Sequence, residues 1–153
     1  MRSFTDYLRS VDDDALLELF TYRADLISPV PSDIASLAVR ACSAPSLARA
    51  IDALNQWHFQ VLEACAVVNE PFNEKQIIAV TEKAAADVLP ELIARGLIYP
   101  SDDGMRLPNS VRDVLGSEIA GLGPASMAKL TLKKLDEAPD AAKKVLELSL
   151  IHI

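Results

Sequence analysis

The residues that could carry chemistry are few, and the most conspicuous is the run Asp12-Asp13-Asp14. Adjacent carboxylates suit a hard cation such as Ca²⁺, which needs several more oxygen ligands held in a defined loop. The glycine and the distal glutamate of a calcium-binding loop do not follow. One aspartate can instead cap the free N–H groups of a helix, while the others favour its positive end. The run therefore predicts the start of a helix over residues 15–22 and no metal site.

The nucleophiles and nitrogen ligands are isolated as well. Cys42 and Cys65 lie far apart and form no C-x-x-C pair, so small buried thiols are expected rather than a zinc site. His58 stands between Trp57 and Phe59 on an expected helix, where a lone histidine packs more often than it binds a metal. No G-x-x-x-x-G-K loop and no G-x-S-x-G turn occurs. We expect no catalytic residue, no cofactor, no small-molecule ligand and no enzyme activity in this chain.

The overall composition limits the number of cores that the chain can form and the partners that it can attract. The 153 residues are 50% hydrophobic and 5% aromatic, which is enough for one core of ordinary size or two small ones. A formal net charge of −7 argues against generic attraction to nucleic acid or to anionic membranes. No apolar run of about 18 residues and no secretory signal is present. We expect a cytoplasmic protein that does not contact the membrane.

The elements that would position a functional site run from residue 55 to residue 115. Their expected order is a helix, a short helix, a third helix, two short strands around a tight turn, and a closing helix. This is the order of a winged helix-turn-helix, whose third helix and hairpin often meet nucleic acid. Asn55 can cap the first helix. Its apolar residues recur at three- and four-residue steps and predict one buried stripe: Leu54, Trp57, Val61, Cys65 and Val68.

Caps and breakers predict the second and third helices. Asn73 is expected to cap the second helix. Its buried side is formed by Ile77, Ile78 and Val80. Asp87 is expected to cap the third helix, which places Pro90 in the first turn, where a missing N–H costs little. Gly96 supplies the left-handed residue that ends this helix.

Turn chemistry predicts the hairpin, or wing. Residues 97–99 and 105–107 form two short apolar runs. Asp103-Gly104 between them is typical of a tight reversal that needs a positive φ. The last helix is expected at Val111–Leu115.

Four short helices are expected before this stretch, in residues 3–52. Ser3 begins the first, with Asp6 three places on as its partner in a capping box. Ser32 opens the third, at Ile34–Ala41. Pro45 stands where the first turn of the fourth helix tolerates a proline.

The chain changes character after Gly116. Residues 121–124 (GLGP) resemble a hinge, and helices are expected at residues 125–135 and 141–150. We therefore predict a mainly α protein in three parts. These are an N-terminal helical subdomain (1–52), a winged helix-turn-helix with a small two-stranded wing (53–116), and a linker with the start of a further helical domain (117–153).

The winged helix contains four basic residues that could contact nucleic acid: Lys83, Arg95, Arg106 and Arg112. Six acidic residues lie in the same stretch, from Glu82 to Gly116, whereas tight DNA binding uses roughly 6–10 phosphate contacts. The expected recognition helix carries Asp87 and Glu91 where a reader of base edges would use Arg, Asn or Gln. Arg106 on the wing is the best placed phosphate contact. We expect weak DNA contact at most and favour a docking surface for a protein partner or for downstream domains of the same parent protein.

Several segments together resemble one family. They are SFTDYLRSVDDDALLELF from Ser3, LARAIDAL from Leu47, FQVLEACAVV from Phe59, LIARGLIYPSDDGMRLPNSVRDVLG from Leu92 and LDEAPDAAKKVLE from Leu135. On these segments the chain resembles the N-terminal region of actinobacterial helicase-associated proteins, described as an XPB-type helicase N-terminal domain. The resemblance covers nearly all of residues 3–147.

This resemblance implies a non-catalytic accessory region of a DNA-transaction protein, with winged-helix modules in series that hold DNA near a motor or dock a partner. The family continues with a Trp-Gly-Pro-Pro-like segment, whereas this chain has LSLIHI after Glu147. We therefore expect a fragment of a longer protein, and residues 149–153 resemble translated adapter sequence. The alternative is a free-standing winged-helix transcription regulator that binds DNA as a dimer.

Overall fold

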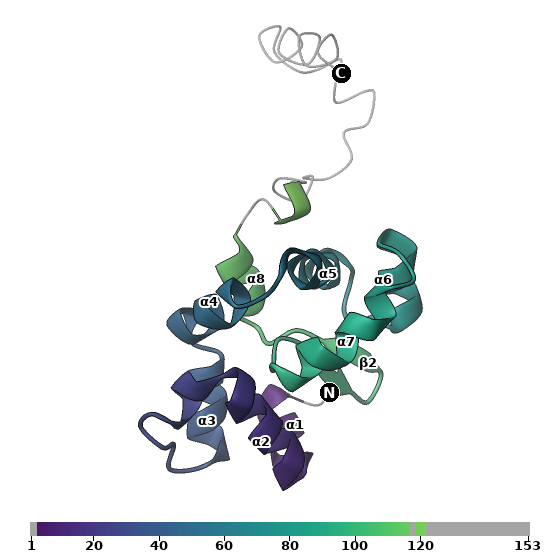
Figure 1. The fold of residues 1–153 in the computed structure, drawn as a ribbon. Coiled ribbons are helices and arrows are strands. Elements are labelled where there is room, and N and C mark those ends of the chain that lie inside the picture. Colours follow the sequence, from purple (N-terminus) through teal and green to yellow (C-terminus); the bar gives the residue numbers. More distant parts are fainter. Residues whose placement is uncertain (1–2, 117–118, 122–153) are drawn as a thin grey trace, which may run out of the picture. The chain divides into compact units, whose positions relative to one another are not determined.

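The computed structural model describes residues 3–116 and 119–121, all within one compact unit, Met1–Gly123. This part of the chain is mainly helical, with a small two-stranded antiparallel sheet (Figure 1). The helices predicted at residues 125–135 and 141–150 lie outside the described residues. The elements, in chain order, are α1 Phe4–Ser10, α2 Asp13–Tyr22, the 3₁₀ helix η1 Ala24–Ile27, α3 Ile34–Ala41, α4 Ala44–Asp52, α5 Gln56–Val67, α6 Glu74–Val80, α7 Ala85–Ala94, β1 Tyr99–Ser101, β2 Gly104–Arg106, α8 Val111–Leu115 and the 3₁₀ helix η2 Ile119–Gly121.

The N-terminal helices begin where side-chain caps are available. The Oγ of Ser3 accepts from the N–H of Asp6 at 3.2 Å, and Asp6 accepts from the N–H of Ser3 at 3.2 Å, so the predicted capping box is confirmed. Asp12 caps α2 by accepting from the N–H of Ala15 at 2.9 Å. The predicted role of the aspartate run as a helix start is therefore confirmed, although α2 begins earlier than residue 15.

The third and fourth helices also follow local chemistry, with one difference. The cap of α3 is Asp33, whose Oδ1 accepts from the N–H of Ser36 at 2.7 Å, so the prediction of Ser32 as the opening residue is wrong. A carboxylate is favoured at this position because it also interacts with the positive end of the helix. Pro45 lies in the first turn of α4 as predicted, where its missing N–H has no intrahelical partner.

The helices α5 and α6 start at the predicted asparagine caps, whereas α7 does not start at the predicted residue. Asn55 accepts from the N–H of His58 at 2.8 Å, and Asn73 accepts from the N–H of Gln76 at 3.1 Å. The helix α7 begins before Asp87, at Ala85, without a side-chain cap. Pro90 therefore lies inside the helix rather than in its first turn. Pro90 is exposed. The helix continues past it and ends at Ala94.

The hairpin forms, but its strands are displaced from the predicted runs. Tyr99 pairs with Arg106 and Ser101 with Gly104, in antiparallel register. Leu97 and Ile98 are not in β1, because their N–H groups bond to the carbonyl of Leu92 at 3.0 and 3.4 Å and close the end of α7. Both observed strands therefore lie closer to the turn than the predicted runs at residues 97–99 and 105–107. Gly96 (φ 66°) and Gly104 (φ 147°) have the positive φ expected of them.

A single additional bridge fastens the hairpin to the helices. Phe72, between α5 and α6, pairs with Met105 of β2 through two backbone hydrogen bonds, of 3.0 and 2.7 Å. The side chain of Phe72 is buried in the core. The wing is therefore fixed to the connection between α5 and α6 as well as to the end of α7.

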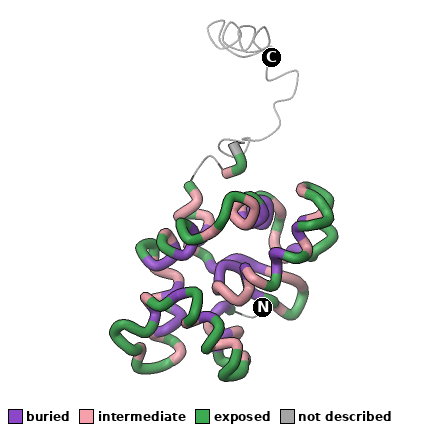
Figure 2. Tube along the Cα trace, in the orientation of Figure 1, coloured by how far each residue is buried: buried purple, intermediate pink, exposed green. Residues whose placement is uncertain are grey.

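Figure 2 marks the buried residues in purple along the chain. In the described part of the chain, the buried apolar side chains form two clusters. The larger is built from α4, α5, α6, α7, α8 and the ends of the hairpin. The smaller joins α1, α2 and α3 and includes Tyr99 of β1. Because Leu47 and Ile51 of α4 lie in the larger cluster, α4 packs with the elements that follow it. The predicted boundary between residues 52 and 53 stays a prediction.

Two of the predicted apolar faces differ from the observed ones. In α6, Ile77 is fully buried, but Val80 is 56% exposed, so the prediction that Val80 is buried is wrong. Trp57 is only partly buried against the larger cluster, whereas Val61 and Cys65 of the same stripe are fully buried. Trp57 and Val80 both line a hollow that is open to solvent.

Arg23 links the N-terminal helices to the end of α7. Its side chain is 2% exposed, and Nη2 donates to the carbonyl of Ala41 at 2.7 Å and to the Oγ of Ser46 at 2.6 Å. Nη1 makes a longer contact, 3.5 Å, with the carbonyl of Arg95. Ser46 in turn donates to Asp25. Burial lowers the pKa of the Arg23 guanidinium, and the nearby Asp25 carboxylate opposes that effect.

Candidate nucleic-acid interface

Arg95, at the C-terminal end of α7, is held by two neighbours. Its Nε and Nη2 donate to Oε1 of Glu91 at 3.0 and 2.7 Å. Its guanidinium carbon lies 4.3 Å from the centre of the Tyr22 ring in α2, a geometry in which the cation is attracted to the ring face. The cation predicted to lie on the recognition helix is thus neutralised and stacked within the protein.

Glu91 also binds His58 and so connects α7 to α5. Nε2 of His58 lies 2.9 Å from Oε2 of Glu91, and Nδ1 lies 2.7 Å from Oδ1 of Asn55. Both ring nitrogens face oxygen atoms, and a ring protonated on both would donate to each. The hydrogen bonds from Arg95 and then from His58 lower the pKa of Glu91.

Arg106, the predicted wing contact, is a structural residue. It is 8% exposed, and its Nη2 donates to Oδ2 of Asp103 at 2.9 Å. Its Nε donates to the Oγ of Ser101 at 3.3 Å, and its Nη1 lies 3.9 Å from Oε2 of Glu70. Hydrogen bonds from Ser101 and from Arg106 lower the pKa of Asp103. The guanidinium therefore ties the turn of the hairpin to the segment that precedes Phe72.

Arg112, in α8, shares Glu70 with Arg106. Its Nη1 donates to Oε1 of Glu70, and its Nε donates to the carbonyl of Ala66 at 3.0 Å. The side chain is 39% exposed, so part of the guanidinium still meets solvent. Glu70 thus pairs with Arg106 and Arg112, two of the four residues that were predicted to contact nucleic acid.

Lys83 differs from the three arginines. It lies exposed in the turn between α6 and α7, and within residues 3–116 and 119–121 no carboxylate pairs with it. The four residues predicted to contact nucleic acid therefore differ in their surroundings. Lys83 faces solvent, whereas Arg95, Arg106 and Arg112 are each paired with a carboxylate. Sequence counting found the shortage of positive charge but could not show which cations were already engaged.

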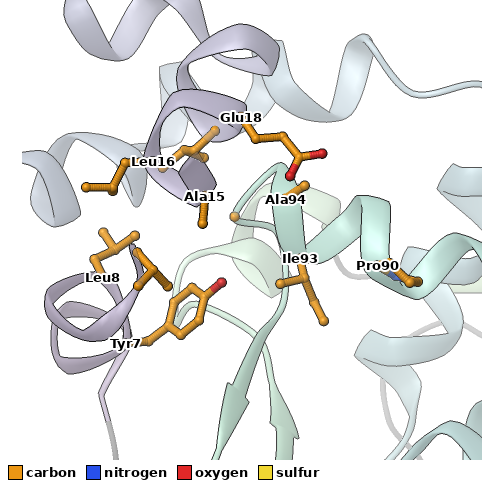
Figure 3. A pocket seen from close by; sticks show the side chains of 11 residues that line it. Tyr7, Leu8, Ala15, Leu16, Glu18, Pro90, Ile93 and Ala94 are labelled. Atoms are coloured by element: carbon orange, nitrogen blue, oxygen red, sulfur yellow. The ribbon is translucent and has the colours of Figure 1, made fainter. Parts of the chain in front are cut away.

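The helix α7 is covered on one side by the N-terminal helices. A cavity of about 110 Å³ lies between α1, α2 and α7 (Figure 3). Its lining is mostly apolar, with Leu8 from α1, Leu16 from α2, and Pro90 and Ile93 from α7. This volume has room for a few water molecules. The exposed side of α7 is correspondingly reduced, and Asp87 is one of its exposed residues.

A larger hollow, the α5–α6 groove, was not anticipated from the sequence. It has a volume of about 670 Å³, opens to solvent and is bordered by α5, the end of α6 and η2. Its apolar lining includes Trp57, Ala64, Val67 and Val80, and its acids are Glu63 and Glu82. The available signal was Val67, which the predicted buried stripe of α5 leaves out, whereas Val80 was wrongly assigned to the buried side of α6.

The thiols are poorly suited to chemistry, and no metal cluster is present in the described residues. Burial raises the pKa of the Cys65 thiol to about 12, and burial also raises that of the half-buried Cys42. A thiol with a raised pKa is a weak nucleophile and a poor metal ligand at neutral pH. Within residues 3–116 and 119–121, no group of three His, Cys, Asp or Glu side chains could hold a metal ion.

Two further findings bear on the class of protein. None of the helices in the described part of the chain combines the length and the apolar character needed to cross a membrane. The chain matches no protein-family model, no curated protein and no solved structure.

Proposed function

We propose that residues 53–116 form a winged helix-turn-helix that serves as a non-catalytic docking module. The order of α5, α6, α7, the β1–β2 hairpin and α8 supports this assignment. So does the bridge from Phe72 to Met105, which fixes the hairpin beside the three helices. A compact helical unit with a fastened hairpin offers rigid surfaces to other molecules.

The packing of α7 against α2 is the observation that carries the docking role. In the helix-turn-helix mode of DNA binding, the recognition helix enters the major groove and its side chains reach base edges. Here Arg95 of that helix is stacked on Tyr22 and paired with Glu91. Pro90 and Ile93 face α1 and α2. These contacts favour a role in which α7 supports the fold and other surfaces meet the partner.

The resemblance to the N-terminal region of helicase-associated proteins gives this module a context. On that reading the chain is an accessory region of a helicase-like DNA-transaction protein, and it docks a partner beside a motor. Direct contact with DNA is weak and depends on exposed cations such as Lys83.

Titration with DNA distinguishes docking from sequence reading. Fluorescently labelled duplex and forked DNA would be titrated with the full chain at low salt, and anisotropy would be recorded. The docking role predicts binding no tighter than micromolar and no preference among sequences. Tight binding to one duplex sequence by a dimer would overturn the docking role and support the transcription regulator instead.

A further inference from the structure

The α5–α6 groove has an exposed apolar floor. Val67 of α5 is 45% exposed and Val80 of α6 is 56% exposed, and both line the groove together with Trp57 and Ala64. Trp57, Ala64 and Val67 follow one another at steps of seven and three residues, so they share one face of α5. Exposed apolar residues gathered along a helix mark an interaction site more often than scattered ones.

The rim of the groove is acidic. Glu63 and Glu82 line it, and among the described residues no Lys, Arg or His side chain does. Glu63 is held in place because Oε1 accepts from the N–H of Ala120 at 2.9 Å, which also fixes η2 as one wall. Glu82 is exposed and follows the end of α6. A partner that fills this groove must therefore tolerate or neutralise two carboxylates.

We propose that the α5–α6 groove binds an amphipathic helix of a partner protein, with bulky aliphatic side chains on one face and lysine or arginine beside them. The proposal rests on the docking role proposed above and names the partner class. An amphipathic helix lays its apolar face into a groove of this kind, and its cations would pair with Glu63 and Glu82. Nucleic acid does not suit the site, because its phosphates would meet the same two carboxylates.

The dimensions of α5 set the length of the partner segment. The helix α5 has 12 residues and so is about 18 Å long at roughly 1.5 Å per residue. A partner helix of about 14 residues would span it. Lysines beside its apolar stripe would then pair with the two glutamates.

The only tryptophan of the chain reports directly on this groove. The full sequence contains one tryptophan, and Trp57 lines the groove, so its emission responds to an occupant. The probe is a synthetic peptide of about 14 residues, built from leucine and lysine in helical spacing and free of tryptophan. The comparison peptide has glutamate in place of every lysine. We expect a saturable change in Trp57 emission with the lysine peptide and none with the glutamate peptide.

Matched variants distinguish binding of the lysine peptide in the groove from non-specific electrostatic binding to an acidic protein. Val80→Asp and Glu82→Lys should each weaken binding of the lysine peptide at least tenfold. Val30→Asp, at a valine that is 79% exposed and does not line the groove, and Glu74→Lys, at an exposed acid outside the lining, should change it less than twofold. All four positions are exposed, and circular dichroism would check that each variant folds.

Three results would overturn the proposal. The first is unchanged Trp57 emission at saturating peptide, and the second is an equal loss of binding in the groove variants and their controls. The third is a concentration-dependent dimer in sedimentation whose formation alone changes Trp57 emission, which would assign the groove to a second copy. Failure of the docking role is separate, because it would appear as tight, sequence-selective DNA binding whatever the peptide does.

Discussion

Two glutamates each bind two nitrogen-bearing side chains, three arginines and one histidine in all, and this pairing decides how the surface can be used. Glu91 binds Arg95 and His58, while Glu70 binds Arg112 and lies 3.9 Å from Arg106. An arginine that already donates to a carboxylate gains less from a phosphate, because the first pair must be broken. At this scale, the number of basic residues overstates the positive charge that is free to bind DNA.

Exchange of the charge at Arg106 should destabilise the fold. Arg106→Glu removes the donor to Asp103 and places a carboxylate next to Glu70, so we expect the free energy of unfolding to fall by about 2–4 kcal/mol. Lys83→Glu makes the same charge change at an exposed site and should alter stability by less than about 0.5 kcal/mol. Urea denaturation of both variants measures the difference. Equal stability of the two would mean that Arg106 is not held as described.

Loss of the Glu91 carboxylate should make the free energy of unfolding less dependent on pH in acidic solution. Its pKa is lowered from 4.5 by Arg95 and then by His58, so the folded state binds the proton less readily than the unfolded chain. The stabilisation is fully present above pH 4.5 and is lost as pH falls through the lower folded value. Glu91→Gln should therefore be less stable than the wild type above that pH, and the difference should shrink on acidification. A difference that does not depend on pH would contradict this linkage.

The two thiols should react at different rates. With its pKa raised to about 12, the fully buried Cys65 has almost no thiolate at pH 8 and should react with Ellman's reagent only when the protein unfolds. The half-buried Cys42 should react slowly in the native protein. In a Cys42→Ser variant, absorbance should stay flat until denaturant is added. A prompt reaction of that variant would show that Cys65 is accessible.

Among the helices and strands, the predictions that succeeded depend on local chemistry. Ser3, Asp12, Asn55 and Asn73 cap helices as expected, because a cap needs only a side-chain oxygen and the next few N–H groups. Ser32 is a local failure, because the adjacent Asp33 takes the cap, but other predictions failed because they depend on distant contacts. The start of α7 and the ends of the strands are set by packing and by bonds such as those from Leu97 and Ile98 to Leu92, which no local pattern specifies.

Gly104 is the hairpin position least able to accept a side chain. It has a φ of 147°, and a Cβ there would lie 2.8 Å from the carbonyl oxygen of Phe72. Gly104→Ala should therefore cost about 2–4 kcal/mol, from backbone strain and from displacement of the bridge.

Gly116→Ala is the matched control for that substitution. Gly116 has a φ of 88°, but nothing lies within 4 Å of a Cβ at this position. Its cost should be limited to backbone strain of about 1–2 kcal/mol. Thermal unfolding of both variants isolates the contribution of the close approach. A Gly104→Ala variant as stable as Gly116→Ala would contradict the described bridge.

For the molecule as a whole, the arrangement of its two core clusters was the least predictable feature. The smaller cluster includes Tyr99 from the hairpin, whose ring centre lies 5.5 Å from that of Phe4. Arg23, Gly96 and Tyr22 bring α2 to the end of α7. The sequence predicted helices on both sides of residue 52 but contained no pattern that pairs α2 with α7. The contact between α2 and α7 is also the reason that we favour a docking role over DNA reading by α7.

The salt dependence of DNA binding by arginine variants tests the central claim most directly. Each phosphate contact contributes about −0.9 to the slope of log K against log salt for duplex DNA. Because Arg95 and Arg112 hold Glu91 and Glu70, we predict that Arg95→Gln and Arg112→Gln leave the slope of the full chain unchanged, to within about 0.3. A slope that becomes shallower by about 0.9 in each variant would show that these arginines contact phosphate, and residues 53–116 would then be a DNA-binding surface rather than a docking module.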